Sequence, residues 1–268
     1  MSAYNYDYYR ELPQDEIINN FSLKDLALLC DSDTLDLANP KYDFIGKYVI
    51  TINEMQYSQY IQHIKHIKNI DILNFHFCKS FSYLFANFTN LESIEGIEHI
   101  DTSHVKNMSN LFYNCKSLTS LDLSRWNVSN VERMDNMFYA CTSLVELNIT
   151  NWNTVSVERM DRMFGYCELL ENLDLNHFCT FNVLDIEDMF RGCKSLQTLD
   201  ISKFNLLNAV LTEDPKHLIE GCKSLNIINL GDCNDYTIKF IITSIEDYIQ
   251  CNLGLIVPIT FKHERQYI

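Results

Sequence analysis

The fold is decided by CKSLTSLDLSRW (residues 115–126) and its three close copies, CTSLVELNITNW (141–152), CELLENLDLNHF (167–178) and CKSLQTLDISKF (193–204). The copies begin at cysteines spaced 26 residues apart. Each contains the pattern LxxLxLxxW or LxxLxLxxF. The central alternation places one exposed side chain between two buried ones, as a short strand does. Every copy therefore predicts one short strand.

A second recurring piece precedes each of these segments. In one copy it consists of apolar residues at i, i+3, i+6, i+7 and i+10, namely Val131, Met134, Met137, Phe138 and Cys141. This spacing favours one face of a helix. Ser129 with Glu132, and Asn182 with Asp185, resemble capping boxes ahead of two such helices. We therefore expect each repeat to be a helix followed by a strand.

Weaker copies extend the repeats to roughly residues 47–261. The positions equivalent to the first cysteine are Ile64, Phe88, Cys115, Cys141, Cys167, Cys193, Cys222 and Cys251. One helix–strand unit cannot bury its apolar face alone, so neighbouring copies must stack. The expected fold is an α/β solenoid of leucine-rich-repeat type, with a parallel sheet on one face and helices on the other. Residues 48–52 could form a first strand and residues 236–250 a terminal helix.

This pattern predicts three parts of the chain. Residues 1–46 would be an acidic N-terminal cap or adaptor segment, residues 47–233 the solenoid, and residues 234–268 a degenerate terminal repeat with a C-terminal cap.

The repeat string VxxMxxMFxxCxSLxxLDLSxW resembles the BspA-like leucine-rich repeat family, most closely over residues 105–152. The resemblance implies a right-handed solenoid with a binding role, usually adhesion or recognition. Members of that family occur among bacterial surface proteins, protist proteins and large DNA viruses.

The first part of the chain carries a second resemblance. Leu12-Pro13, Asp25-Leu26 and Leu29-Cys30 resemble pieces of F-box-like N-termini, and residues 12–48 are the segment concerned. This resemblance implies recruitment of a ubiquitin-ligase component. The interval between the first two pieces is shorter than in the F-box pattern, and the expected tryptophan is absent. The alternative is a capping helix from Ser22 to about Cys30, which would close the first coil.

Composition excludes several classes of partner. The formal charge of −15 repels phosphate backbones and anionic lipid surfaces, so we expect no nucleic-acid or membrane partner. No stretch reaches the roughly 18 consecutive apolar residues of a membrane span. The N-terminus does not resemble a secretory signal. Together with ten cysteines, this predicts a reduced, intracellular protein, in the cytoplasm or, for a viral protein, in the host cytoplasm or virion. The oligomeric state is left open.

The recurring cysteines do not predict a metal site. A solenoid places one thiol per coil in a row, whereas zinc needs four ligands that converge on one point. Buried core residues are the expected role of this column. His63 and His66 stand at helical spacing with no carboxylate or cysteine near in sequence, which indicates a solvated surface. No catalytic or phosphate-binding motif occurs, so we expect no enzyme activity, no cofactor and no bound metal.

The exposed residue at the centre of each predicted strand is the first candidate for binding. In a parallel stack these side chains would form a ladder on the concave sheet surface, with about 4.8 Å between rungs. The ladder consists of Asp71, Glu95, Asp122, Asn148, Asp174, Asp200 and Asn229. Its carboxylates would attract a partner with a basic surface. The alternative is that Asp or Asn belongs to the repeat itself and is satisfied by water and by hydroxyls such as that of Ser124.

A neighbouring position differs from copy to copy, and this variation could supply specificity. It is occupied by Arg125, Asn151, His177, Lys203 and Asp232. The cationic members could instead compensate the nearby carboxylates.

Together, these features predict a non-enzymatic protein–protein interaction scaffold that binds its partner on the concave face, with a ubiquitin-ligase substrate adaptor as its sharper form. The alternatives are a structural component of a viral particle or surface layer, and an adhesin exported without a conventional signal.

Overall fold

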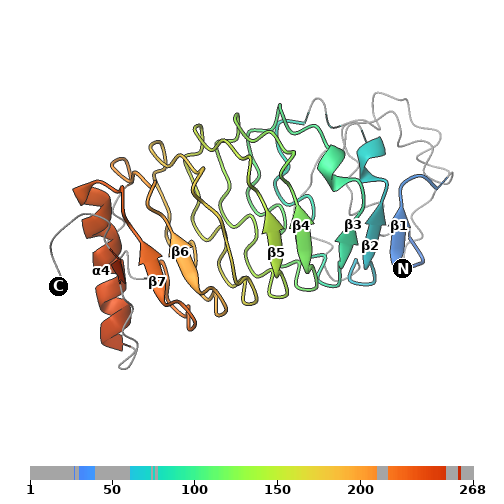
Figure 1. The fold of residues 1–268 in the computed structure, drawn as a ribbon. Coiled ribbons are helices and arrows are strands. Elements are labelled where there is room, and N and C mark those ends of the chain that lie inside the picture. Colours follow the sequence, from blue (N-terminus) through green and yellow to red (C-terminus); the bar gives the residue numbers. More distant parts are fainter. Residues whose placement is uncertain are drawn as a thin grey trace.

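A computed structural model of the chain describes Ala27, Phe75 and residues 30–39, 61–73, 78–209, 217–251 and 259–260. Within these residues the chain winds in successive coils that lie side by side in one elongated row (Figure 1). The predicted first strand at residues 48–52 lies outside the described residues. So does most of residues 12–48, with the F-box-like pieces and the alternative capping helix.

Each short strand pairs in parallel with a strand of the neighbouring coil. β1 (Thr34–Asp36), β2 (His66–Lys68) and β3 (Ser93–Ile94) form one sheet, and β4 (Ser120–Asp122) pairs with β5 (Glu146–Asn148). β6 (Thr198–Asp200), β7 (Ile227–Asn229) and β8 (Ile259–Thr260) form another. Residues 172–174, between β5 and β6, are not a strand, so the row is interrupted there. The predicted row of parallel strands is confirmed, and β1 lies within the segment predicted as the N-terminal cap.

The chain holds one long helix among its described residues, α4 (Asp235–Cys251), close to the predicted terminal helix at residues 236–250. Two single turns of 3-10 helix, η3 (Ile70–Ile72) and η4 (Ile97–His99), follow β2 and β3. No described helix combines the length and apolar character that crossing a bilayer requires.

The predicted register of the first repeat is wrong by three residues. Ile67, rather than Ile70, pairs with Ile94. Ile61 therefore takes the position of Phe88, and Ile64 that of Leu91, with all four side chains buried. Apolar residues recur at every third position from Ile61 to Leu73, so this spacing alone did not fix the register.

The helices predicted on the other side of the coils are absent from the described repeats. Residues 135–140 and their equivalents form consecutive turns instead. Asn136 and Ala140 have positive φ, 56° and 59°, and the same two positions are left-handed in the neighbouring coils. A left-handed residue at every fourth position breaks the hydrogen-bonding pattern of an α-helix. The proposed capping boxes at Ser129 and Asn182 therefore start no helix.

Hydrogen bonds between coils replace those that a helix would make. The amides of Met134, Asn136 and Phe138 donate to carbonyls of the next coil, at 2.9 Å each. Residues 80, 107, 133, 159 and 185 form a second line of parallel bridges just before these turns. The apolar spacing that resembled a helical face is equally the spacing of side chains that point inward from successive turns.

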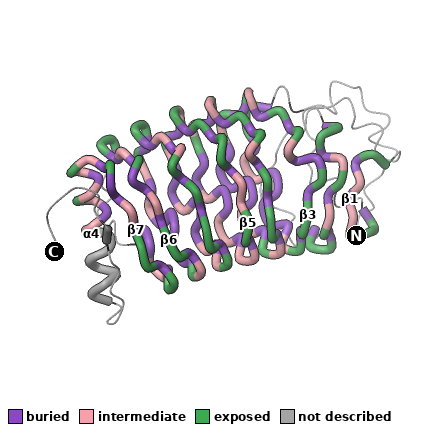
Figure 2. Tube along the Cα trace, viewed as in Figure 1, coloured by how far each residue is buried: buried purple, intermediate pink, exposed green. Residues whose placement is uncertain are grey.

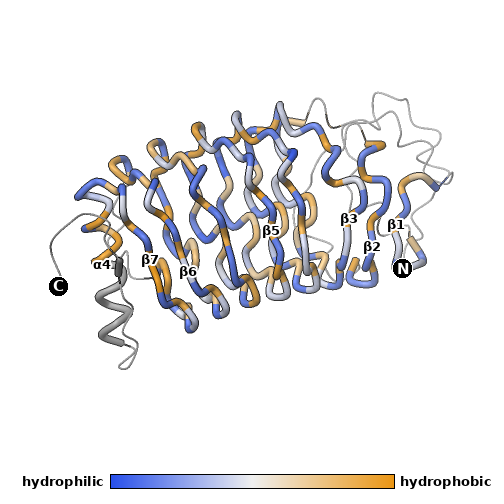
Figure 3. The backbone as a smooth tube through the Cα atoms, in the orientation of Figure 1, coloured by the Kyte–Doolittle hydropathy of each residue, from blue (hydrophilic) through white to orange (hydrophobic). Residues whose placement is uncertain are grey.

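The interior is built from columns of identical residues. Phe85, Phe112, Phe138, Phe164 and Phe190 stack along the row, with ring centroids 5.2 to 5.8 Å apart in neighbouring pairs. Figures 2 and 3 show buried and hydrophobic positions recurring from coil to coil. Trp152 is buried as expected, but Leu147 is only partly buried. The core prediction is thus confirmed for the stacked phenylalanine column and Trp152, whereas Leu147 and Ile72, which is 42% exposed, depart from it.

Candidate functional site

The outward side chains that end the strands form a row across the coils, which we call the strand row. Asp36 pairs in register with Lys68, Asp122 with Asn148, and Asp200 with Asn229. Glu95 directly follows β3, and Asp174 occupies the equivalent place on the interrupted rung. The structure therefore brings together six of the seven predicted ladder residues and adds Asp36 and Lys68.

Asp71 is the exception. It lies in η3, three residues beyond Lys68, and its side chain is exposed. The shifted register explains the difference, because Lys68, the last residue of β2, takes the position of Glu95. The strand row is therefore not uniformly acidic toward its N-terminal end.

Each Asp or Asn of the strand row caps the turn that follows its strand. The Oδ1 atoms of Asp122, Asp174 and Asp200 accept hydrogen bonds from the amides two residues later, at 3.0 Å each. Asn229 Nδ2 in turn donates to Asp200 Oδ2 at 2.9 Å. These contacts are those of an Asx turn, so the residue type has a structural role at this position.

Hydrogen bonding favours the charged form of Asp122. The side-chain hydrogen bond from Ser124, and then the backbone hydrogen bond from the same residue, lower the pKa of Asp122. A smaller contribution comes from the charge of nearby Arg125. The carboxylate is thus ionised at neutral pH and remains exposed to a partner.

A shallow groove crosses the strand row where the sheet is interrupted. Its lining includes Asp122, Val145, Glu146, Leu147, Asn148 and Asn172. Val145 is 44% exposed, and Leu147 is partly buried against the core. The groove, which we call the strand-face groove, therefore combines two apolar side chains with two exposed carboxylates, a combination suited to an apolar side chain beside a cation.

The variable position beside the row has a different chemistry in each coil. Arg125 is exposed near Asp122, and Asn151 Nδ2 donates to the carbonyl of Ser124 at 3.2 Å. Lys203 forms an ion pair with Asp232, so its charge is compensated within the chain. His177 has an Nε2 atom with no hydrogen-bond partner among the described residues, and its ring contacts that of Phe178 edge-on at 5.1 Å.

Sequence reasoning missed a network of ion pairs on the turns, which we call the Arg–Asp network. Arg133 binds Asp135 through both carboxylate oxygens, at 2.9 and 3.1 Å. Arg159 contacts Asp161 of its own coil at 2.9 Å and Asp185 of the next at 3.2 Å. The repeated ERMD at residues 132–135 and 158–161 was the available signal. On the helices that the sequence predicted, these Arg and Asp side chains would have lain apart on an exposed face. The ion pairs were therefore not expected.

The column of cysteines is buried and hydrogen-bonded. The thiols of Cys115, Cys141, Cys167, Cys193 and Cys222 each donate to a phenylalanine carbonyl of the preceding coil, at 3.0 to 3.2 Å. Burial raises the pKa of the Cys141 thiol to about 12. Within the described residues, no three histidine, cysteine or acidic side chains are grouped so that they could hold a metal ion.

Stacked parallel coils on a leucine-rich strand motif define a repeat protein of the leucine-rich solenoid class. The chain belongs to the family described as a Mycoplasma protein of unknown function, DUF285, whose model matches residues 53–146, 79–204 and 122–231. This agrees with the BspA-like resemblance of the repeats. The F-box-like segment lies before the matched residues.

Three solved structures show remote likeness. The TLR13–ssRNA13 complex has 16% identity and a TM-score of 0.27, and the match covers 66% of this chain and 27% of that one. An internalin from Listeria monocytogenes has 13% identity, a TM-score of 0.23 and coverage of 75% and 64%. An LRR protein of Leptospira interrogans has 16% identity, a TM-score of 0.24 and coverage of 81% and 65%. The chain thus spans less than two thirds of each of these proteins, and no curated protein matches it.

Proposed function

We propose that the chain is a non-enzymatic scaffold that binds a protein partner in the strand-face groove. The observation that supports this most directly is the groove itself. Leu147 and Val145 offer apolar surface there, and Asp122 and Glu146 line the same groove. The partner would present an apolar side chain next to lysine or arginine.

The geometry favours a binding face over a catalytic site. Every Asp or Asn of the strand row accepts a hydrogen bond within a turn, and the thiols of the cysteine column are held as hydrogen-bond donors to backbone carbonyls. Neither arrangement pairs a nucleophile with a base. Most of the groove is lined by β4 and β5, whose backbones are hydrogen-bonded to each other. The side chains of these strands are therefore held in place before a partner binds.

The more specific functions remain predictions. A ubiquitin-ligase adaptor would depend on residues 12–48, most of which lie outside the described structure. The sequence also predicts an intracellular location and a division of the chain after residues 46 and 233. The two alternative functions, a structural component and an adhesin, are likewise expectations from the sequence.

A photocrosslinking amino acid in place of Glu146 tests the proposal, with the same substitution at exposed Lys116 as the matched control. The full chain would be expressed with each substitution and crosslinked in cells. We expect one protein to crosslink from Glu146 and not from Lys116, and to be lost when Leu147→Ser is added. Equal products from both positions, or products that survive Leu147→Ser, would overturn the proposed groove.

A further inference from the structure

An exposed apolar column lies on a different stretch of the coils from the strand row. Val155, Phe181 and Leu207 occupy one repeat position in three successive coils and are 43%, 49% and 52% exposed. Leu184, on the same coil as Phe181, is 41% exposed. The two preceding coils carry Ser103 and Ser129 at the same position. The change from serine to large apolar residues is therefore confined to one end of the row.

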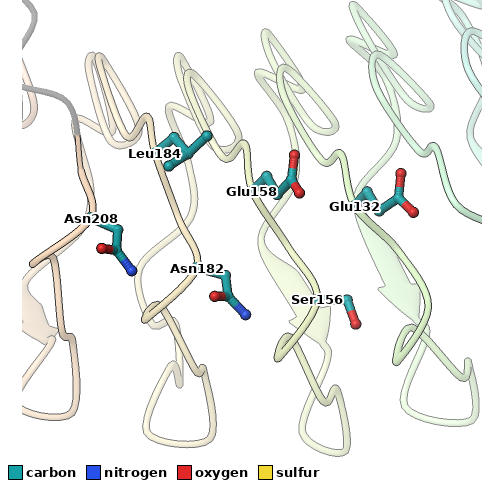
Figure 4. Close-up of a pocket in the computed structure, with 6 residues that line it drawn as sticks. All are labelled: Glu132, Ser156, Glu158, Asn182, Leu184 and Asn208. Atoms are coloured by element: carbon teal, nitrogen blue, oxygen red, sulfur yellow. The ribbon is translucent and has the colours of Figure 1, made fainter.

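The backbone beneath this patch is held in place by side chains of the next coil. Asn182 Nδ2 donates to the carbonyl of Val155 at 2.8 Å, and Asn208 Nδ2 donates to that of Phe181 at 2.7 Å. Figure 4 shows Ser156, Asn182 and Asn208 in one row across the coils, with Glu132, Glu158 and Leu184 in a second row beside it. The apolar side chains are thus presented from fixed positions, which reduces the entropy lost when a partner binds.

The spacing of the column fits a helix better than an extended strand. Rungs of a parallel stack are about 4.8 Å apart. Successive turns of an α-helix are about 5.4 Å apart, so side chains at i, i+3 or i+4, and i+7 of a helix lying along the row would meet successive rungs. Alternate residues of a strand are about 6.6 Å apart and would lose register by the third rung.

The charges around the patch select a cationic partner. Lys106 is paired with Glu132 at 2.5 Å, and Arg159 is held by Asp161 and Asp185. Glu158 is exposed and has no ion-pair partner among the described residues. The net charge of −15 also opposes the approach of a second copy of this chain.

We propose that Val155, Phe181, Leu207 and Leu184 form a second docking surface, independent of the strand-face groove, that binds an amphipathic helix carrying a lysine or arginine opposite Glu158. With two separate surfaces, one chain would hold two partners at once.

A phage-displayed library of single amphipathic helices, selected on the full chain, tests this proposal. We expect recovered helices to carry apolar residues at i, i+3 or i+4, and i+7, with a flanking lysine or arginine. In fluorescence anisotropy titrations, Phe181→Ser should weaken their binding by about tenfold or more, as loss of a central apolar anchor does. Glu158→Gln should weaken it less and reduce its dependence on salt. Glu171→Gln, at an exposed position away from the patch, is the matched control.

Several outcomes would overturn the proposal. They are recovery of no helix, recovered helices without cationic residues, and binding that Phe181→Ser leaves unchanged. Self-association in sedimentation that is abolished by Phe181→Ser would identify a second copy as the occupant. Hydroxyl-radical labelling of Phe181 as slow as that of buried Phe178 would show that another part of the chain covers the patch. Leu147→Ser leaves this surface intact, so failure here is distinguishable from failure of the strand-face proposal.

Discussion

Phe112 and Phe138, 26 positions apart, stack with ring centroids 5.5 Å apart and ring planes 4° from parallel. Each ring is fully buried and contacts its counterpart in the next coil on both sides. One side chain therefore joins three coils. Contacts of this kind hold a stack in which no coil has a core of its own.

Phe138→Ala should therefore lower the free energy of unfolding by about 3–5 kcal/mol, through lost transfer energy and the cavity left between two rings. Urea denaturation of the purified chain measures the change. Phe181→Ala provides the control, because Phe181 is exposed and its loss should change stability by about 0.5 kcal/mol or less. Equal midpoints for the two variants would be incompatible with the stacked column.

The cysteine column should be chemically inert in the native protein. The Cys141 thiol is buried, its pKa is raised to about 12, and it donates to the Phe112 carbonyl at 3.1 Å. Cys179 is partly exposed. Iodoacetamide labelling followed by peptide mass spectrometry should modify Cys179 first and Cys141 only after denaturant is added. Rapid labelling of Cys141 in the native state would show that the column is open to solvent.

Asp135 and Asp161 occupy equivalent positions in the Arg–Asp network. Their contributions to the stability of the fold should change with pH in opposite directions. Burial raises the pKa of Asp135, but hydrogen bonds from Arg133 and Ser109 more than offset this, so the pKa is lowered. Burial and the neighbouring Asp185 raise the pKa of Asp161 despite its hydrogen bond from Arg159. Charged Asp135 thus stabilises the fold above its unfolded pKa, and this stability is lost as the pH falls through its folded pKa. Asp161 shows the reverse dependence, because the fold favours its neutral form. Its contribution to stability is present below its unfolded pKa and is lost as the pH rises through its folded pKa.

At neutral pH, Asp135→Asn should therefore be less stable than Asp161→Asn, and the difference should shrink as the pH falls below about 4, the pKa of an unperturbed Asp. Urea midpoints of both variants at neutral and acidic pH measure this. The reverse order at neutral pH would contradict the assigned contacts.

The sequence predicted the parallel strands, the buried columns and the terminal helix because those depend on patterns within one repeat. Leu121 and Leu123 flank Asp122 in the sequence as they do in the structure, and the same alternation recurs in the other copies. The helices were wrong because their apolar spacing also fits consecutive turns. The left-handed conformations of Asn136 and Ala140 decide between the two, and their stabilising hydrogen bonds come from a different coil.

The candidate site was predictable only in part, for the same reason. The outward position of Asp122 follows from alternation, but the gap beside Leu147 follows from the missing strand at residues 172–174. The contact of Arg159 with Asp185 likewise joins residues of two coils. Such features depend on how copies meet, and a single repeat does not specify them.

Binding in the strand-face groove, steered by the carboxylates of the strand row, is the central claim, and the association rate of the partner captured from Glu146 tests it most directly. The triple variant Asp122→Asn, Asp174→Asn and Asp200→Asn keeps an oxygen that can accept each turn hydrogen bond, so the chain should fold. Like-charge repulsion alone would suggest that this variant gains stability. The lowered pKa of Asp122 shows that the fold favours the charged carboxylate, so we expect a small loss of stability instead. At low salt, the association rate should fall by about tenfold and lose most of its dependence on ionic strength. An association rate equal to that of the wild type at every salt concentration would contradict the claim and leave the strand row with a structural role alone.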